Sequence, residues 1–229
     1  MGTQGSMSRS LRKSANFIFK IHITALESQT PTIQLYPVMD GLYVVSDHQG
    51  DMLDFLERMF SRLADLFVST PDMQHRFIVK GSLAYGPVVH GSSLLPAASA
   101  TLVNNQNYRN ALLLGMPMIQ AYLGEKKAPP FGVFVNESAR AFCPAGAPAV
   151  HPLTVSWWTW FRPGQWIALA QELRTEMNLY CDWCSQRSHA IDYPVEKIKE
   201  HRGLIMEYLA DVPLPAPVVA PAPVPAAAP

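Results

Sequence analysis

The sequence predicts an α+β domain followed by a helical appendage. From residue 17 to residue 142, β-rich runs alternate with one long run whose apolar residues recur at helical spacing. After Cys143 the composition changes to a Pro/Ala/Gly loop and then to a tryptophan-rich, helix-patterned region. At 229 residues the chain can bury one sizeable core. We expect four parts: a flexible N-terminal lead (1–14), an α/β domain (15–142), a Trp-rich helical appendage (143–211) and a disordered Pro/Ala tail (212–229).

The charge balance and the apolar stretches exclude several classes of protein. Lys and Arg number 18 and Asp and Glu number 18, so the chain has no net charge and no electrostatic footprint for nucleic acid. Every apolar stretch is interrupted before the roughly 18 residues that a membrane-spanning helix needs, and no secretory signal is visible. We therefore expect a cytoplasmic protein with no nucleic-acid and no membrane partner.

The first ordered elements are predicted to be strands. Residues 17–24 are β-branched and aromatic with partial alternation, which is typical of a strand. Residues 32–39 and 42–46 are β-rich runs on either side of an Asp40-Gly41 pair. An Asp-Gly pair between two such runs predicts a hairpin, because a type I′ turn needs positive φ at both central residues.

The next segment changes to helical periodicity. Between residues 51 and 68 the apolar side chains recur every three or four residues with charged side chains between them, which predicts an amphipathic helix packed on a sheet. Asp51 would lie near its start, where a carboxylate interacts favourably with the helix dipole.

The middle of the chain is predicted to continue as strand, loop, helix and strand. Residues 76–91 form an extended segment, and the Gly- and Ser-rich residues 91–107 have the composition of a loop. A helix is expected over residues 112–125, with Pro117 in its first turn, where the missing N–H is harmless. Residues 131–135 then return to strand, and Asn136 is a candidate cap for a short helix.

The appendage is predicted to contain two helices, over residues 165–186 and 194–209. The tryptophans that cluster between residues 157 and 183 contribute much buried area if they face inward, and they would also suit a subunit contact.

The three cysteines, Cys143, Cys181 and Cys184, are an odd number and form no disulfide framework. Cys181 and Cys184 have the spacing of a zinc or redox pair, but a zinc site normally needs four ligands and a second knuckle is missing. The favoured interpretation is two half-buried thiols on a helix.

One group of short motifs resembles a known enzyme class. The motifs are Lys80-Gly81-Ser82-Leu83, then Gly86, and then Gly115, Ala121, Tyr122 and Glu125. In this order and spacing, residues 33–142 resemble the second half of a class III nucleotidyl cyclase catalytic domain, and within that class the pyrimidine (cytidylate/uridylate) cyclases of the bacterial Pycsar antiphage system. The resemblance implies a ferredoxin-like, class III cyclase-type antiparallel sheet with helices on one face.

The resemblance also implies a reaction and a site. Such enzymes convert a nucleoside triphosphate into a 3′,5′-cyclic nucleotide and pyrophosphate at a head-to-tail homodimer interface, using two divalent cations, Mg²⁺ or Mn²⁺, held by two aspartates. Asp40 in the hairpin turn corresponds to the second metal aspartate, and Asp47 is the nearby candidate for the first. Lys80 is expected to face phosphate as a catalytic residue. The expected substrate-binding residues are Gly81, Gly86 and Tyr122.

The chain departs from the pattern of the family in two respects. The opening strand has Phe19 or Lys20 where the first metal aspartate belongs, and Ile119 and Leu123 replace the Asn and Arg with which purine cyclases stabilise the transition state. Purine cyclase activity of the usual kind is therefore not expected.

Three functions remain open. The first is a Pycsar-like pyrimidine cyclase that signals in antiviral defence. The second is a catalytically degenerate dimerisation or nucleotide-sensing module that lacks one metal aspartate. The third is an unrelated α+β binding domain, in which the glycines are turn residues and Asp40 is only what a tight hairpin favours.

Overall fold

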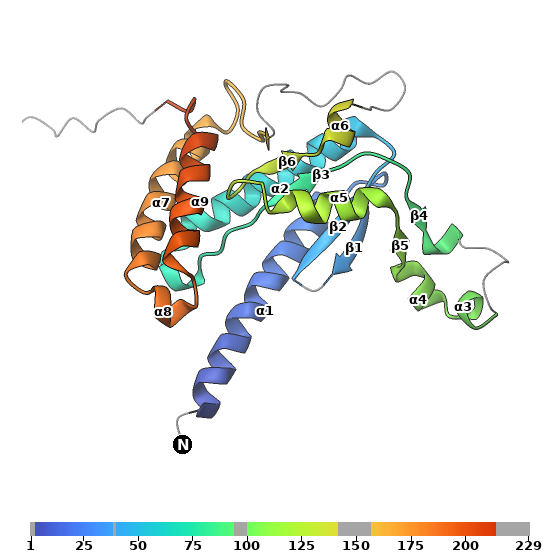
Figure 1. Cartoon of the computed structure of the whole chain (residues 1–229), viewed down its shortest axis with the longest axis horizontal. Helices are drawn as coiled ribbons and strands as arrows, with labels where there is room; N and C mark the ends of the chain where they lie inside the picture. The colour runs from blue at the N-terminus through green and yellow to red at the C-terminus, as the bar shows by residue number, and fades with distance from the viewer. Residues whose placement is uncertain (1–2, 39, 94–99, 142–156, 214–229) are drawn as a thin grey trace, which may run out of the picture.

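The computed structural model describes residues 3–38, 40–93, 100–141 and 157–213 (Figure 1). It confirms the mixed α+β class. The first half of this part contains α1 (Thr3–Ser28), β1 (Gln34–Val38), β2 (Gly41–Val45), α2 (Gln49–Ser69), η1 (Met73–His75), β3 (Gly81–Leu83), β4 (Val89–His90) and η2 (Gly91–Ser93). The second half contains α3 (Ala100–Asn104), α4 (Gln106–Ala111), β5 (Leu113–Leu114), α5 (Met116–Glu125), β6 (Val133–Val135), α6 (Glu137–Ala141), β7 (Trp157–Trp158), α7 (Ile167–Ser185), α8 (Ser188–Ile191) and α9 (Val195–Tyr208). Cys143 and most of the expected tail lie outside the described residues.

The strand predicted over residues 17–24 is wrong, because these residues lie in helix α1. The helix begins at Thr3, inside the segment expected to be a flexible lead, and its N-terminal half projects away from the rest of the protein (Figure 1). Ile21 and Ala25, one helical turn apart, are buried where α1 packs against α2. This burial overrides the local strand preference of the β-branched and aromatic side chains, since β-propensity depends strongly on context.

The hairpin is confirmed, with a shifted turn. Strands β1 and β2 pair in antiparallel fashion and Val38 is opposite Gly41, so Asp40 lies in the turn between them. Gly41 belongs to β2 and does not have the positive φ expected of it. The turn position of Asp40 is nevertheless as predicted.

The resemblance implies one antiparallel sheet, whereas the described strands form three small sheets. One is the β1–β2 hairpin, one is the antiparallel pair β4–β5, and the third has the order β3-β6-β7. Strand β3 pairs with β6 in parallel, and helix α5 lies in the connection between them. The strands after the hairpin are only two or three residues long, and Gly86 and Pro87 interrupt the segment between β3 and β4, so no long ladder forms.

Helices α2, α5, α7 and α9 confirm the predicted helices, and Pro117 lies in the first turn of α5. The short helix after β6 is also confirmed, since the Asn136 side chain accepts a hydrogen bond from the Ser138 N–H at 3.0 Å. The loop prediction for residues 91–107 is wrong in part. Residues 100–104 form α3, and α4 begins at Gln106, where the Asn105 side chain caps it by accepting from the Tyr108 N–H.

Helix α2 is the centre of the core. Phe55, Leu63 and Phe67 of this helix are fully buried, and so are Leu173 and Met177 of α7. All five belong to one continuous cluster that also contains side chains of β6 and α9. The C-terminal helices, drawn in orange and red in Figure 1, therefore share a core with the α/β part.

Two polar contacts also tie the C-terminal region to the rest. The Trp160 indole N–H donates to the Phe131 carbonyl oxygen at 2.8 Å, and both side chains are completely buried. The Arg76 guanidinium pairs with the Glu176 carboxylate of α7 at 2.6 Å, and the Arg76 side chain is buried. The inward orientation expected for the tryptophans is thus found at Trp160.

Within the described residues, no helix combines the length and the apolar composition needed to cross a bilayer.

Candidate functional site

The two predicted metal aspartates lie at opposite ends of strand β2. Asp40 is exposed in the turn before it, and Asp47 is exposed two residues after its end at Val45. A strand rises about 3.3 Å per residue, so Asp40 and Val45 are roughly 16 Å apart. A two-metal site places its cations about 3.5–4 Å from each other. Within one chain these two carboxylates therefore do not fit a shared Mg²⁺ or Mn²⁺ pair.

No group of three or more His, Cys, Asp or Glu side chains within the described residues is arranged to hold a metal ion. Cys181 and Cys184 are buried on α7, as expected for two thiols on a helix. Burial raises the pKa of the Cys184 thiol to about 11 and also raises the pKa of Cys181. Both sulfurs are therefore neutral, apolar core groups at neutral pH.

Lys80 is held by an acidic side chain. It lies directly before β3, its side chain is only 11 % exposed, and its Nζ is 3.6 Å from Glu125 Oε1 at the end of α5. A phosphate at Lys80 would have to compete with this carboxylate for the ammonium group. In this structure the Lys80 ammonium is therefore paired with the Glu125 carboxylate, whose side chain is 42 % exposed.

A histidine lies close to this ion pair. His201 of α9 is buried, and its Nδ1 forms a hydrogen bond with the Tyr193 hydroxyl. Burial is the main cause that lowers the pKa of His201 to about 4, and the positive charges of Lys80 and Lys197 contribute to this value against an opposing effect of Glu200. His201 is therefore neutral at pH 7. Nothing in the sequence predicts this cluster, because Lys80 and His201 are far apart in the chain and come together only in the folded protein.

Gly86 and Gly115 allow two chain segments to cross closely. Both have positive φ, 153° and 154°. A Cβ on Gly86 would lie 3.0 Å from Pro117 Cγ, and one on Gly115 would lie 2.7 Å from the Pro87 carbonyl oxygen. Both glycines thus position α5 relative to the strand segment before it.

Gly81 also has a packing role. A Cβ on this residue would lie 3.0 Å from the Phe60 ring of α2 and 3.5 Å from Val133 of β6. The motif glycines that the resemblance assigns to substrate binding therefore have a structural explanation in this fold.

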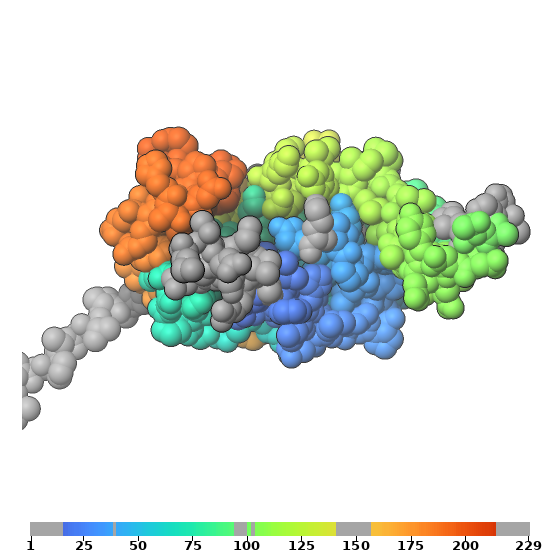
Figure 2. Space-filling model, turned by 90° about the horizontal axis from the view of Figure 1, so that it is seen from below, coloured from blue at the N-terminus to red at the C-terminus, as the bar shows by residue number. Residues whose placement is uncertain are grey.

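The outward side of α5 is apolar and exposed. We call it the α5 outer face, and it consists of Met116, Ile119, Tyr122 and Leu123. Seen from below, α5 adjoins the hairpin on one face of the protein (Figure 2). The two positions at which purine cyclases carry Asn and Arg, Ile119 and Leu123, are thus exposed apolar side chains.

Tyr122 has the surroundings of a ligand-stacking residue. The ring is exposed, and the Lys126 ammonium lies 5.7 Å from its centroid. Burial raises the pKa of Tyr43 on β2, and the electrostatic effect of Tyr122 raises it further. Of the predicted site residues, Tyr122, Asp40 and Asp47 have side chains that are exposed to solvent.

Family models, curated proteins and solved structures were all compared with the chain, and none matches it. Function is therefore inferred from the residues of the hairpin, β3 and α5.

We expect Gly115→Ala to destabilise the protein by about 1–3 kcal/mol, because its backbone conformation is strained for any residue with a Cβ and the new methyl meets the Pro87 carbonyl. Gly203 is the matched control, since it lies within α9 and a Cβ there meets nothing within 4 Å. Gly203→Ala should stabilise by about 0.5–1 kcal/mol. Urea unfolding of both variants measures these changes. A Gly115→Ala variant as stable as Gly203→Ala would contradict the close approach of Gly115 to the Pro87 carbonyl oxygen.

We expect the free energy of unfolding to fall as the pH is lowered from about 6.5 to about 4. In this window the unfolded chain protonates His201 while the folded chain, with its pKa of about 4, does not, so protons favour unfolding. The loss is roughly 3 kcal/mol, taking 1.4 kcal/mol per pKa unit. Urea unfolding at several pH values should show a shallower dependence for His201→Gln. The same slope for both proteins would show that His201 is not buried in its neutral form.

Proposed function

We propose that this chain is a catalytically degenerate relative of the class III nucleotidyl cyclases that binds a nucleotide without cyclising it. The observation that carries this proposal is the position of Asp40 and Asp47 at opposite ends of β2. The ion pair between Lys80 and Glu125 supports it, because it occupies the cation expected to face phosphate.

The chemistry of the reaction explains why this arrangement disfavours turnover. Cyclisation requires charge neutralisation on the phosphates and activation of the ribose 3′-hydroxyl, which paired cations supply. A single exposed carboxylate at Asp40 localises a cation weakly, and the apolar Ile119 and Leu123 offer no charge stabilisation. Binding without catalysis fits these side chains better.

The surface around Tyr122 supports nucleotide binding. An exposed aromatic ring stacks on a nucleobase with about 1–3 kcal/mol per base. Lys126 beside the ring provides a positive charge for a phosphate, and Tyr43 adds a second aromatic side chain. A nucleoside triphosphate is therefore the proposed ligand, and this site would serve as a sensor.

A second candidate function is an active pyrimidine cyclase for antiphage signalling. It is favoured by the exposure of Asp40, since a carboxylate at an open hairpin tip is accessible to a neighbouring subunit. In a head-to-tail homodimer that subunit would supply the missing carboxylate for Mg²⁺ or Mn²⁺. The product would be a 3′,5′-cyclic pyrimidine nucleotide, with release of pyrophosphate.

Incubation of the purified protein with each of the four nucleoside triphosphates and Mn²⁺ separates these candidates. We expect measurable binding by calorimetry and no cyclic product by mass spectrometry. Tyr122→Ala should weaken binding about tenfold, the equivalent of 1.4 kcal/mol of stacking. Tyr108→Ala is the matched control, because Tyr108 on α4 is 58 % exposed and Tyr122 is 57 % exposed.

The alternative outcomes identify the other functions. Cyclic product that disappears in Asp40→Ala would establish the enzyme and refute the degenerate module. Neither binding nor product with any nucleotide would leave an unrelated α+β domain.

A further inference from the structure

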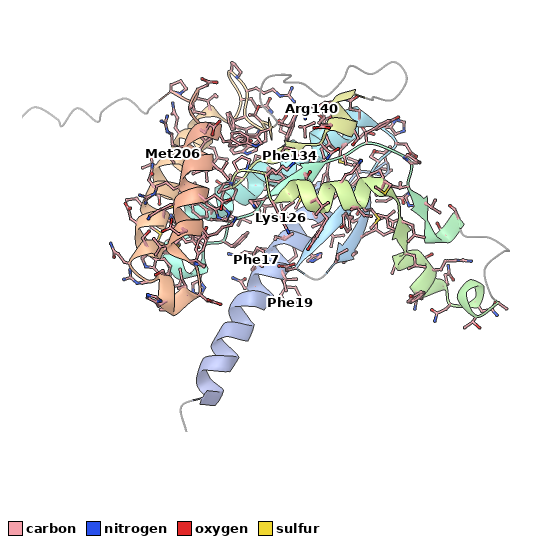
Figure 3. All side chains as sticks on the ribbon, in the orientation of Figure 1. Phe17, Phe19, Lys126, Phe134, Arg140 and Met206 are labelled. Carbon is pink, nitrogen blue, oxygen red and sulfur yellow. The ribbon has the colours of Figure 1, made fainter. Side chains whose placement is uncertain are left out.

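Helix α1 has apolar side chains on two opposite sides. The inner side contains Ile21 and Ala25, which are buried against the body of the protein. The outer side contains Phe19, Ile23 and Leu26, which are between 52 and 63 % exposed. Phe19 is labelled beside α1 in Figure 3. We call these three residues the α1 outer stripe.

The spacing of the α1 outer stripe is that of a helix-pairing seam. Phe19, Ile23 and Leu26 are separated by four and then three residues, which is the d-a-d pattern of a heptad repeat. A helix that is apolar on opposite sides is normally covered on both. The inner side already has its partner in α2, so the stripe is the side that remains to be covered.

We propose that a second copy of this chain covers the stripe, with the two α1 helices packed antiparallel and Ile23 next to the twofold axis. Such a contact is self-complementary, because each chain presents the same three side chains to the other. Phe19 of one chain then lies opposite Leu26 of the other. This inference does not depend on the proposed nucleotide function.

The charges of α1 favour the antiparallel direction. Glu27 is the single acidic residue in the sequence of α1, and the basic residues Arg9, Arg12, Lys13 and Lys20 all precede it. A parallel pair would bring the two basic N-terminal halves together, whereas an antiparallel pair separates them.

Lys20 and Glu27 provide the matching contacts. They are seven residues apart and therefore flank the stripe on the same side, so in an antiparallel pair Lys20 of each chain lies near Glu27 of the other. Within one chain these side chains have only loose partners. Glu27 lies 3.4 Å from Arg62 in an exposed pair, and the Lys20 ammonium lies 5.7 Å from the Phe77 ring centroid.

The size of the stripe sets the expected strength. Stable interfaces bury about 800 Å² per partner, and three half-exposed side chains supply less than this. The dimer should therefore be reversible and depend on protein concentration.

Sedimentation velocity of the full chain, from low micromolar to submillimolar concentration, tests the proposal. We expect the wild-type protein to shift reversibly from monomer to dimer, and Ile23→Glu to remain monomeric. Ile119→Glu on the α5 outer face is the matched control, since Ile119 is 53 % exposed and Ile23 is 52 % exposed. This control should dimerise like the wild type.

Charge reversal tests the direction of the helices. Lys20→Glu and Glu27→Lys should each weaken the dimer at low salt, and the double variant Lys20→Glu/Glu27→Lys should restore it, because each side chain again faces an opposite charge. Circular dichroism confirms that every variant is folded.

Three results would overturn the proposal. A wild-type protein that stays monomeric throughout would refute self-association. Loss of the dimer in Ile119→Glu but not in Ile23→Glu would move the interface to α5. A double charge reversal no better than the single ones would refute the antiparallel arrangement. Nucleotide binding is measured in a separate experiment, so a failure of the dimer proposal neither supports nor refutes the nucleotide proposal.

Discussion

The fold depends on the burial of helix α2 by elements from both ends of the chain. Leu63 and Phe67 are fully buried. The Phe67 ring makes edge contacts with both Phe131 and Tyr180. Those two rings come from the segment before β6 and from α7, so a single side chain of α2 joins the small parallel sheet to the C-terminal helices. With strands of two to five residues, the sheets have little stability of their own, and packing on α2 holds them in place.

This core also determines which side chains are available for function. Because α9 packs beside α7, His201 and its neighbouring charges are brought towards Lys80, and Glu125 at the end of α5 neutralises that ammonium group. The hairpin and the outward side of α5 are left facing solvent with Asp40 and Tyr122. The packing thus pairs Lys80 with Glu125, while Asp40 and Tyr122 stay exposed to solvent.

Much of this fold was predictable from the sequence where the periodicity is strong. Helix α2 and the C-terminal helices have clear helical spacing, and the Asp-Gly pair correctly placed Asp40 in a turn. Helix α1 was not predictable, because its residues favour a strand locally and only the burial of Ile21 against α2 makes them helical. The interactions of Lys80 with Glu125 and His201 were also not predictable from the sequence, since they depend on how helices distant in the chain pack. Asp47 is near Asp40 in sequence, but the full length of β2 separates the two residues.

Unfolding of Leu63→Ala, followed by two probes, tests directly whether α2 holds the two ends of the chain together. All five tryptophans lie between residues 157 and 183, so their fluorescence reports on the C-terminal region, while far-UV circular dichroism reports on all helices. Removing a fully buried leucine should cost about 2–5 kcal/mol. We predict that both probes show one coincident transition and that both shift together. A fluorescence transition that stays at the wild-type position would show that the C-terminal helices do not depend on α2.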